Sequence, residues 1–139
     1  PMILHDNDAY VFEELEQDRA LLFNWKHVPG LGIELFKEAI LEFAELCQKH
    51  EPAKGVIDAR QLDQSSPAVA WLRGQASEEA EQYDEWWARE VLPKYISANL
   101  GQLAVATGDP SAPGEVPKPQ QDAALRMGYF PDMDAAREW

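Results

Sequence analysis

Residues 55–67 limit the folds open to this chain more than any other stretch. They read Gly-Val-Ile-Asp-Ala-Arg-Gln-Leu-Asp-Gln-Ser-Ser-Pro. The β-branched pair before Asp58 is typical of a strand buried on both faces in a parallel sheet. Ser66 followed by Pro67 is a favoured helix start, with serine at the N-cap and proline at the first helical position. This succession predicts an α/β fold, in which binding sites lie at the carboxyl ends of the strands.

Length and charge narrow the class of protein. The 139 residues, 45% of them hydrophobic, suit one globular domain, which we place at residues 2–139. A net charge of -13 with scattered basic residues argues against nucleic-acid binding. No apolar run is long enough to insert into a membrane, and the single Cys47 suits a reducing compartment, so we expect a cytoplasmic protein.

The segments before residue 55 predict a hairpin and a helix. Alternating residues in 9–28 indicate two antiparallel strands around a polar turn, and the second is apolar enough to lie inside the sheet. Residues 31–49 carry a wide apolar stripe at helical spacing, which predicts a helix packed on a sheet face. The strand at 54–59 follows.

The segments after residue 67 are predicted to alternate helix and strand. Residues 68–100 are expected to form two helices, broken near Gly74, restarted by Ser77 as a cap and kinked or ended near Leu92 by Pro93. Further expectations are a strand at 101–107, an exposed loop at 108–119 with four prolines and two glycines, a short helix at 120–127, an edge strand at 127–130 and a helix capped by Asp132. The expected fold is therefore a mixed, mostly parallel sheet of about five strands, opened by a hairpin and covered by helices.

Three motifs resemble the small bacterial STAS-like proteins, which are related in fold to the SpoIIAA anti-sigma-factor antagonists. The first is Val56-Ile57-Asp58-Ala59-Arg60-Gln61-Leu62, which looks like that group's strand ending in an Asp-x-Arg-x-Leu run. The second is Trp71 with the segment from Trp86-Trp87 to Leu92-Pro93, and the third is the closing stretch from Tyr129-Phe130 to Trp139. Together they cover most of the chain in order and spacing.

The resemblance implies a STAS-like fold and a signalling or binding role without catalysis. In the antagonists, a serine after the equivalent strand is phosphorylated by a partner kinase. Ser66 would match that serine, with Ser65 beside it, although Pro67 stands where the antagonists have glycine. For Ser66 two interpretations are open and compatible: a helix N-cap, or a phosphorylation switch facing Asp58 and Asp63.

Asp58 and Arg60 also have two interpretations. They can form an ion pair that fixes the loop, or Arg60 can offer its donors to a carboxylate or phosphate of a ligand. With Asp63, they are our candidates for contact with a partner or ligand. His27, at the end of a predicted strand, could approach Asp58 as in a hydrolase, although no complete nucleophile–base arrangement is visible.

Other polar residues are expected to be structural. Cys47 suits core packing, and His50 suits a contact with the carboxyl end of its helix. The acidic residues between positions 78 and 85 are read as a solvated helix face. We therefore expect neither a metal site nor a cofactor.

Trp86 and Trp87 are neighbours, so they point about 100° apart on a helix and cannot both face one core. One should pack on the sheet, and the other should line a pocket or cover a partner surface. From these features we expect a non-enzymatic module, as a homodimer, that binds a protein partner through residues 58–67. The alternative is a carrier or sensor that holds a small apolar ligand between the 77–98 helix and the sheet.

Overall fold

A seven-stranded mixed sheet forms the centre of the fold in a computed structural model, which describes residues 1–63, 66–75, 77–116 and 125–139. Its strands lie in the order β1-β2-β3-β4-β5-β7-β6. Their bounds are β1 Met2–Asp6, β2 Tyr10–Leu15, β3 Ala20–Trp25, β4 Lys54–Asp58, β5 Gln102–Ala106, β6 Gly114–Glu115 and β7 Arg126–Phe130. The class predicted from the sequence, α/β with a mixed sheet, is confirmed.

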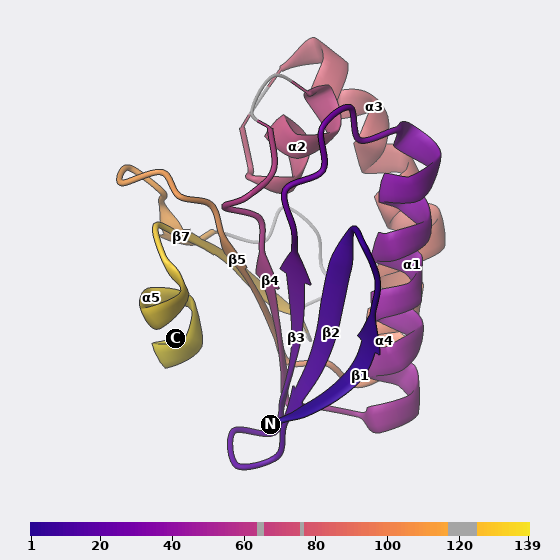
Figure 1. Ribbon diagram of the computed structural model, residues 1–139, viewed down its shortest axis with the longest axis vertical. Coiled ribbons are helices and arrows are strands. Elements are labelled where there is room, and N and C mark those ends of the chain that lie inside the picture. Colours follow the sequence, from indigo (N-terminus) through magenta and orange to yellow (C-terminus); the bar gives the residue numbers. More distant parts are fainter. Residues whose placement is uncertain (64–65, 76, 117–124) are drawn as a thin grey trace.

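The sheet divides into an antiparallel half and a parallel half. β2 pairs antiparallel with both β1 and β3, whereas β3, β4, β5 and β7 run parallel to one another, and β6 pairs antiparallel with β7. β4 is buried along its whole length, as its apolar run predicts. In Figure 1 the carboxyl ends of the parallel strands lie at the top, toward α2, and the β2–β3 turn lies at the bottom.

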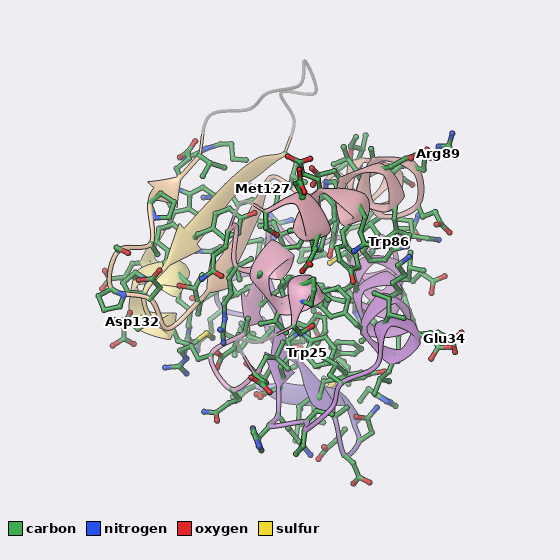
Figure 2. All side chains as sticks on the ribbon, turned by 90° about the horizontal axis from the view of Figure 1, so that it is seen from above. Trp25, Glu34, Trp86, Arg89, Met127 and Asp132 are labelled. Atoms are coloured by element: carbon green, nitrogen blue, oxygen red, sulfur yellow. The ribbon has the colours of Figure 1, made fainter. Side chains whose placement is uncertain are left out.

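α1 (Ile33–His50) covers one face of the sheet. Its buried residues follow the helical stripe read from the sequence, and Phe36 and Phe43 are fully buried beside Phe23 and Trp25 of β3. Cys47 packs in the same core with no exposed surface. In Figure 2 Trp25 lies inside the fold, whereas Glu34 of α1 points away from it. The helix therefore packs on the sheet as the wide apolar stripe indicates.

The helical segment after β4 is divided into four pieces. These are α2 (Pro67–Leu72), α3 (Glu78–Trp86), a π-helical turn η1 (Trp87–Val91) and α4 (Leu92–Ser97). The break predicted near Gly74 is present, with φ of +77° at that glycine, and the Ser77 hydroxyl accepts a hydrogen bond from the Ala80 amide. Pro93 does not end the helix, because the wider π turn before it leads directly into α4.

α5 (Met133–Glu138) lies on the opposite face of the sheet. It packs against a small apolar cluster that includes Val56, Ala104 and Phe130. Asp132 caps it as predicted, accepting a hydrogen bond from the Ala135 amide. Lys54, which is nearly buried, donates to the Arg137 carbonyl at 2.8 Å at the other end of the helix, where a cation suits the helix dipole.

Four sequence expectations need correction. The sheet has seven strands instead of about five, because β1 and the two-residue β6 were not foreseen. It is not mostly parallel, since three of its six strand pairings are antiparallel. β6 lies inside the expected loop at 108–119, of which 117–119 are outside the described residues. The helix expected at 120–127 is also wrong where it is described, because residues 126 and 127 belong to β7; residues 120–124 are not described.

Within the described ranges, no helix is both long enough and apolar enough to cross a membrane.

Candidate functional site

The carboxyl end of β4 carries the candidate site, and Asp58 and Arg60 are joined there. The Arg60 side chain donates from Nε to Asp58 Oδ1 and from Nη2 to Asp58 Oδ2, both at 2.9 Å. The Arg60 backbone amide donates to the same Oδ1 at 3.1 Å. The Asp58 side chain is 11% exposed and that of Arg60 is 39% exposed. The ion-pair interpretation is confirmed, and these hydrogen bonds raise the pKa of Arg60.

Residues 59–62 form a tight turn, which we call the strand-end turn. Its Leu62 amide points back to the Ala59 carbonyl, and Leu62 is buried, whereas Arg60 and Gln61 are exposed. Asp63, which follows, is exposed as well. The buried Leu62 side chain therefore fixes the turn to the core, while the polar side chains of Arg60 and Gln61 face solvent.

Arg73, which the sequence reasoning missed, holds this turn from below. It follows α2, is only 5% exposed, and donates from Nη2 to the Ala59 carbonyl at 2.7 Å and to the Leu62 carbonyl at 2.9 Å. Its Nε has no hydrogen-bond partner among the residues that the structure describes. Burial lowers the pKa of Arg73, and the nearby Asp109 and Asp63 oppose that effect. One feature of the sequence could have indicated that Arg73 is buried: it lies four residues after Val69, on the same side of the helical segment as this buried residue.

The loop after β5 borders the turn. Thr107 is buried and bridges two segments: its hydroxyl donates to the Phe130 carbonyl at 3.2 Å and accepts from the Asp109 amide at 3.0 Å. Gly108 has φ of +81°, and a Cβ added at this glycine would lie 3.6 Å from Cγ of Arg60, in ordinary van der Waals contact. A shallow hollow of about 290 Å³ lies between Arg73, Thr107 and Pro110. Two neighbouring strand ends thus form one continuous edge.

Ser66 occupies the N-cap position of α2 with Pro67 at the start of the helix, as expected. Its backbone is extended and its carbonyl accepts from the Ala70 amide at 3.0 Å. Its side chain makes no capping hydrogen bond, so the expectation that the hydroxyl caps the helix is wrong. Ser65 lies outside the described residues.

His27 reaches the strand-end turn and not the Asp58 carboxylate. Its Nδ1 lies 3.3 Å from the Gln61 carbonyl oxygen, at hydrogen-bonding distance. The Asp58 carboxylate is instead occupied by Arg60. His50, at the other end of α1, lies 3.5 Å from a Glu14 oxygen.

Trp86 and Trp87 both belong to the aromatic packing between the helices. Trp86 is 7% exposed and lies beside Phe36 and Trp71, on the inner side of its helix in Figure 2. Trp87 is half-buried and contacts Trp71 and Tyr95. The Trp71 ring lies 5.8 Å from the Trp86 ring and 5.7 Å from the Trp87 ring, so both belong to one aromatic cluster. The acidic residues of α3 are exposed, as predicted for a solvated face.

The arrangement offers hydrogen-bonding groups that are fixed at the end of β4. The His, Cys, Asp and Glu side chains of the described residues form no group of three that could hold a metal ion. No protein-family model, curated protein or solved structure matches the chain. A function for this site therefore rests on the contacts of Asp58, Arg60 and Arg73.

Proposed function

We propose that the protein is a non-enzymatic interaction module that binds a protein partner through the strand-end turn and the residues that follow it, up to position 67. The observation that carries the proposal is the anchoring of the turn. Arg73 holds two of its carbonyls from the buried side, and Asp58 holds Arg60 from the strand. A turn that is already ordered loses little conformational entropy when a partner binds, which favours affinity.

The exposed groups fit recognition better than catalysis. Arg60 keeps a partly exposed guanidinium beside Gln61 and Asp63, and the chain is otherwise strongly acidic. A fixed arginine surrounded by negative charge can select a carboxylate on a partner by a charge-assisted hydrogen bond. The STAS-like fold that we also propose for this chain rests on its three sequence motifs, the first of which contains Asp58 and Arg60.

Site-specific photo-crosslinking tests this proposal. A photoreactive amino acid at Gln61, introduced in cells of the source organism, should give an adduct of one defined mass. The same residue at Glu81, exposed on α3, is the matched control. Arg60→Ala should abolish the adduct from position 61. Equal adducts from both positions, or none from position 61, would contradict the proposal.

Phosphorylation of Ser66 is the regulated form of the same proposal. The Ser66 hydroxyl makes no capping bond, so phosphorylation would not remove a cap. A phosphate there would add charge close to Asp63 and would weaken binding of an acidic partner. Intact-mass measurement of protein from its source cells should show a phosphorylated fraction; an unmodified chain under every growth condition would remove this form.

The ligand-carrier alternative would require the helix–sheet core to open. The rings in this core include Phe36, Phe43 and Tyr95, which are fully buried, and the Phe43 ring lies 6.5 Å from the Tyr95 ring. A ligand in this position would therefore have to displace packed aromatic side chains. Native mass spectrometry of the purified protein distinguishes the two functions: a retained small molecule would favour the carrier.

A further inference from the structure

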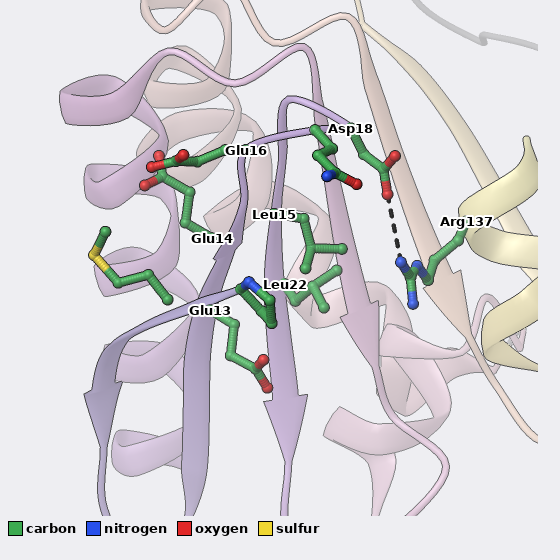
Figure 3. Close-up of a pocket in the computed structure, with 10 residues that line it drawn as sticks. Glu13, Glu14, Leu15, Glu16, Asp18, Leu22 and Arg137 are labelled. Carbon is green, nitrogen blue, oxygen red and sulfur yellow. Dashed lines mark hydrogen bonds and ion pairs between the residues drawn. The ribbon is translucent and has the colours of Figure 1, made fainter.

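A second surface lies far from the strand-end turn, on the sheet face that carries α5. α5 covers the part of this face formed by β4, β5 and β7. Beside it, a groove of about 740 Å³ opens over β2, β3 and their turn. We call it the hairpin groove and define it by Met2, residues 13–18, Leu22 and Arg137. Figure 3 shows Leu15 and Leu22 side by side at its centre.

The floor of the hairpin groove is apolar. Leu22 is buried and Leu15 is half-buried, and both pack at the margin of the cluster beneath α5. At the sheet edge, Met2 and Ile3 of β1 are 51% and 61% exposed. Exposed apolar side chains beside a groove are typical of a surface that another molecule covers.

The rim of the groove is acidic. Glu13, Glu14, Glu16 and Asp18 surround the two leucines, as Figure 3 shows. Positive charge comes from Arg137, whose Nη2 lies 3.4 Å from an Asp18 carboxylate oxygen. Glu13 accepts a hydrogen bond from Asn24, and His50 faces Glu14 at 3.5 Å. Carboxylates therefore outnumber the cations at this surface.

We propose that the hairpin groove binds a basic, amphipathic segment of another protein. Apolar side chains of that segment would cover Leu15 and Leu22, and its lysines or arginines would pair with the rim carboxylates. A second copy of this chain is a poor occupant, because each copy carries a net charge of -13. Arg137 already occupies Asp18 within the molecule, through an exposed ion pair that is weak enough to exchange.

This proposal is independent of the proposed function, since the groove and the strand-end turn lie at opposite ends of the sheet (Figure 1). The probe is a synthetic amphipathic helix of leucine and lysine, with a second peptide in which glutamate replaces lysine. Amide NMR shifts of the labelled protein should change at residues of β1–β3 with the lysine peptide only. Changes spread over the exposed face of α3 would overturn the proposal, because they would indicate binding to acidity in general.

Charge-matched variants make the test specific. Glu13→Lys with Glu16→Lys should weaken binding about tenfold, whereas Glu79→Lys with Glu81→Lys, which makes the same change of charge on α3, should weaken it less than about twofold. Leu15→Asn should also weaken binding, and Arg137→Gln should strengthen it by removing a competitor for Asp18. Equal losses in the two lysine pairs, or no effect of Leu15→Asn, would refute the proposal. Dimerisation through the same residues without peptide would also refute it, since a second copy would then be the occupant.

Discussion

Replacing Arg73 by methionine tests the part of the structure on which the proposed function depends. Methionine fills a similar volume but cannot donate, so the carbonyls of Ala59 and Leu62 lose hydrogen bonds of 2.7 and 2.9 Å. Each bond from a charged donor contributes about 1.5–3 kcal/mol. Removing a buried guanidinium whose Nε is unpaired among the described residues offsets part of this loss. We expect a net destabilisation of about 2–4 kcal/mol.

Urea unfolding followed by tryptophan fluorescence measures this loss, since the chain has five tryptophans. The midpoint should fall by about 1–2 M. Arg89→Met is the matched control, because the Arg89 side chain is 76% exposed and pairs with the similarly exposed Glu85; its effect should stay below about 0.5 kcal/mol. Equal effects of the two substitutions would refute the anchoring role of Arg73. Amide exchange should also speed up at positions 60–62 in the Arg73 variant, under conditions where the β4 amides stay protected.

Three further predictions concern the core. Tyr95→Phe should raise stability by about 1 kcal/mol in thermal unfolding, because the buried Tyr95 hydroxyl has no partner within the described ranges; a loss would show that it has one. Burial raises the pKa of Cys47 to about 12, so the thiol of the unfolded chain ionises at a lower pH than that of the folded chain. The free energy of unfolding should therefore be unaffected below pH 9 and should fall by about 1.4 kcal/mol per pH unit above it. Cys47→Ala should remove this slope between pH 9 and 10, and an unchanged slope would contradict the assignment. Gly74→Ala should lower the free energy of unfolding by more than about 2 kcal/mol, because the new Cβ would lie 2.8 Å from the Tyr129 ring. The control is Gly30→Ala, whose new Cβ meets open space and which should show only the backbone cost of about 1 kcal/mol. Similar losses in the two variants would argue against the close contact at Gly74.

The sequence predicts most of the framework because that framework follows local patterns. The all-buried β4, the stripe of α1 and the caps at Ser77 and Asp132 all depend on residues within one or two turns of each other. β1 was missed because an edge strand with exposed Met2 and Ile3 has no buried face to produce alternation. β6 consists of two residues, and its pairing with β7 is visible only in the folded chain.

Local patterns also predict where the candidate site lies, but they do not predict that Arg73 belongs to it. Asp58 and Arg60 are two residues apart, so their ion pair could be inferred directly. Arg73 donates to the carbonyls of Leu62 and Ala59, which lie 11 and 14 residues earlier in the chain, so this contact depends on the tertiary fold and not on a local pattern. The tryptophan pair was expected to divide between a ring packed on the sheet and a ring that lines a pocket or partner surface; Trp86 is buried, Trp87 is half-buried, and both rings contact Trp71, a residue too distant in sequence for that contact to be inferred.

The proposed function requires that hydrogen bonds hold the strand-end turn in one conformation before any partner binds. Backbone ¹⁵N order parameters of the free protein at positions 60–62 test it most directly. We predict values of about 0.85, equal to those of β4, because hydrogen bonds hold the turn from both sides. Values below about 0.6 at these positions would show a flexible loop and would contradict the account.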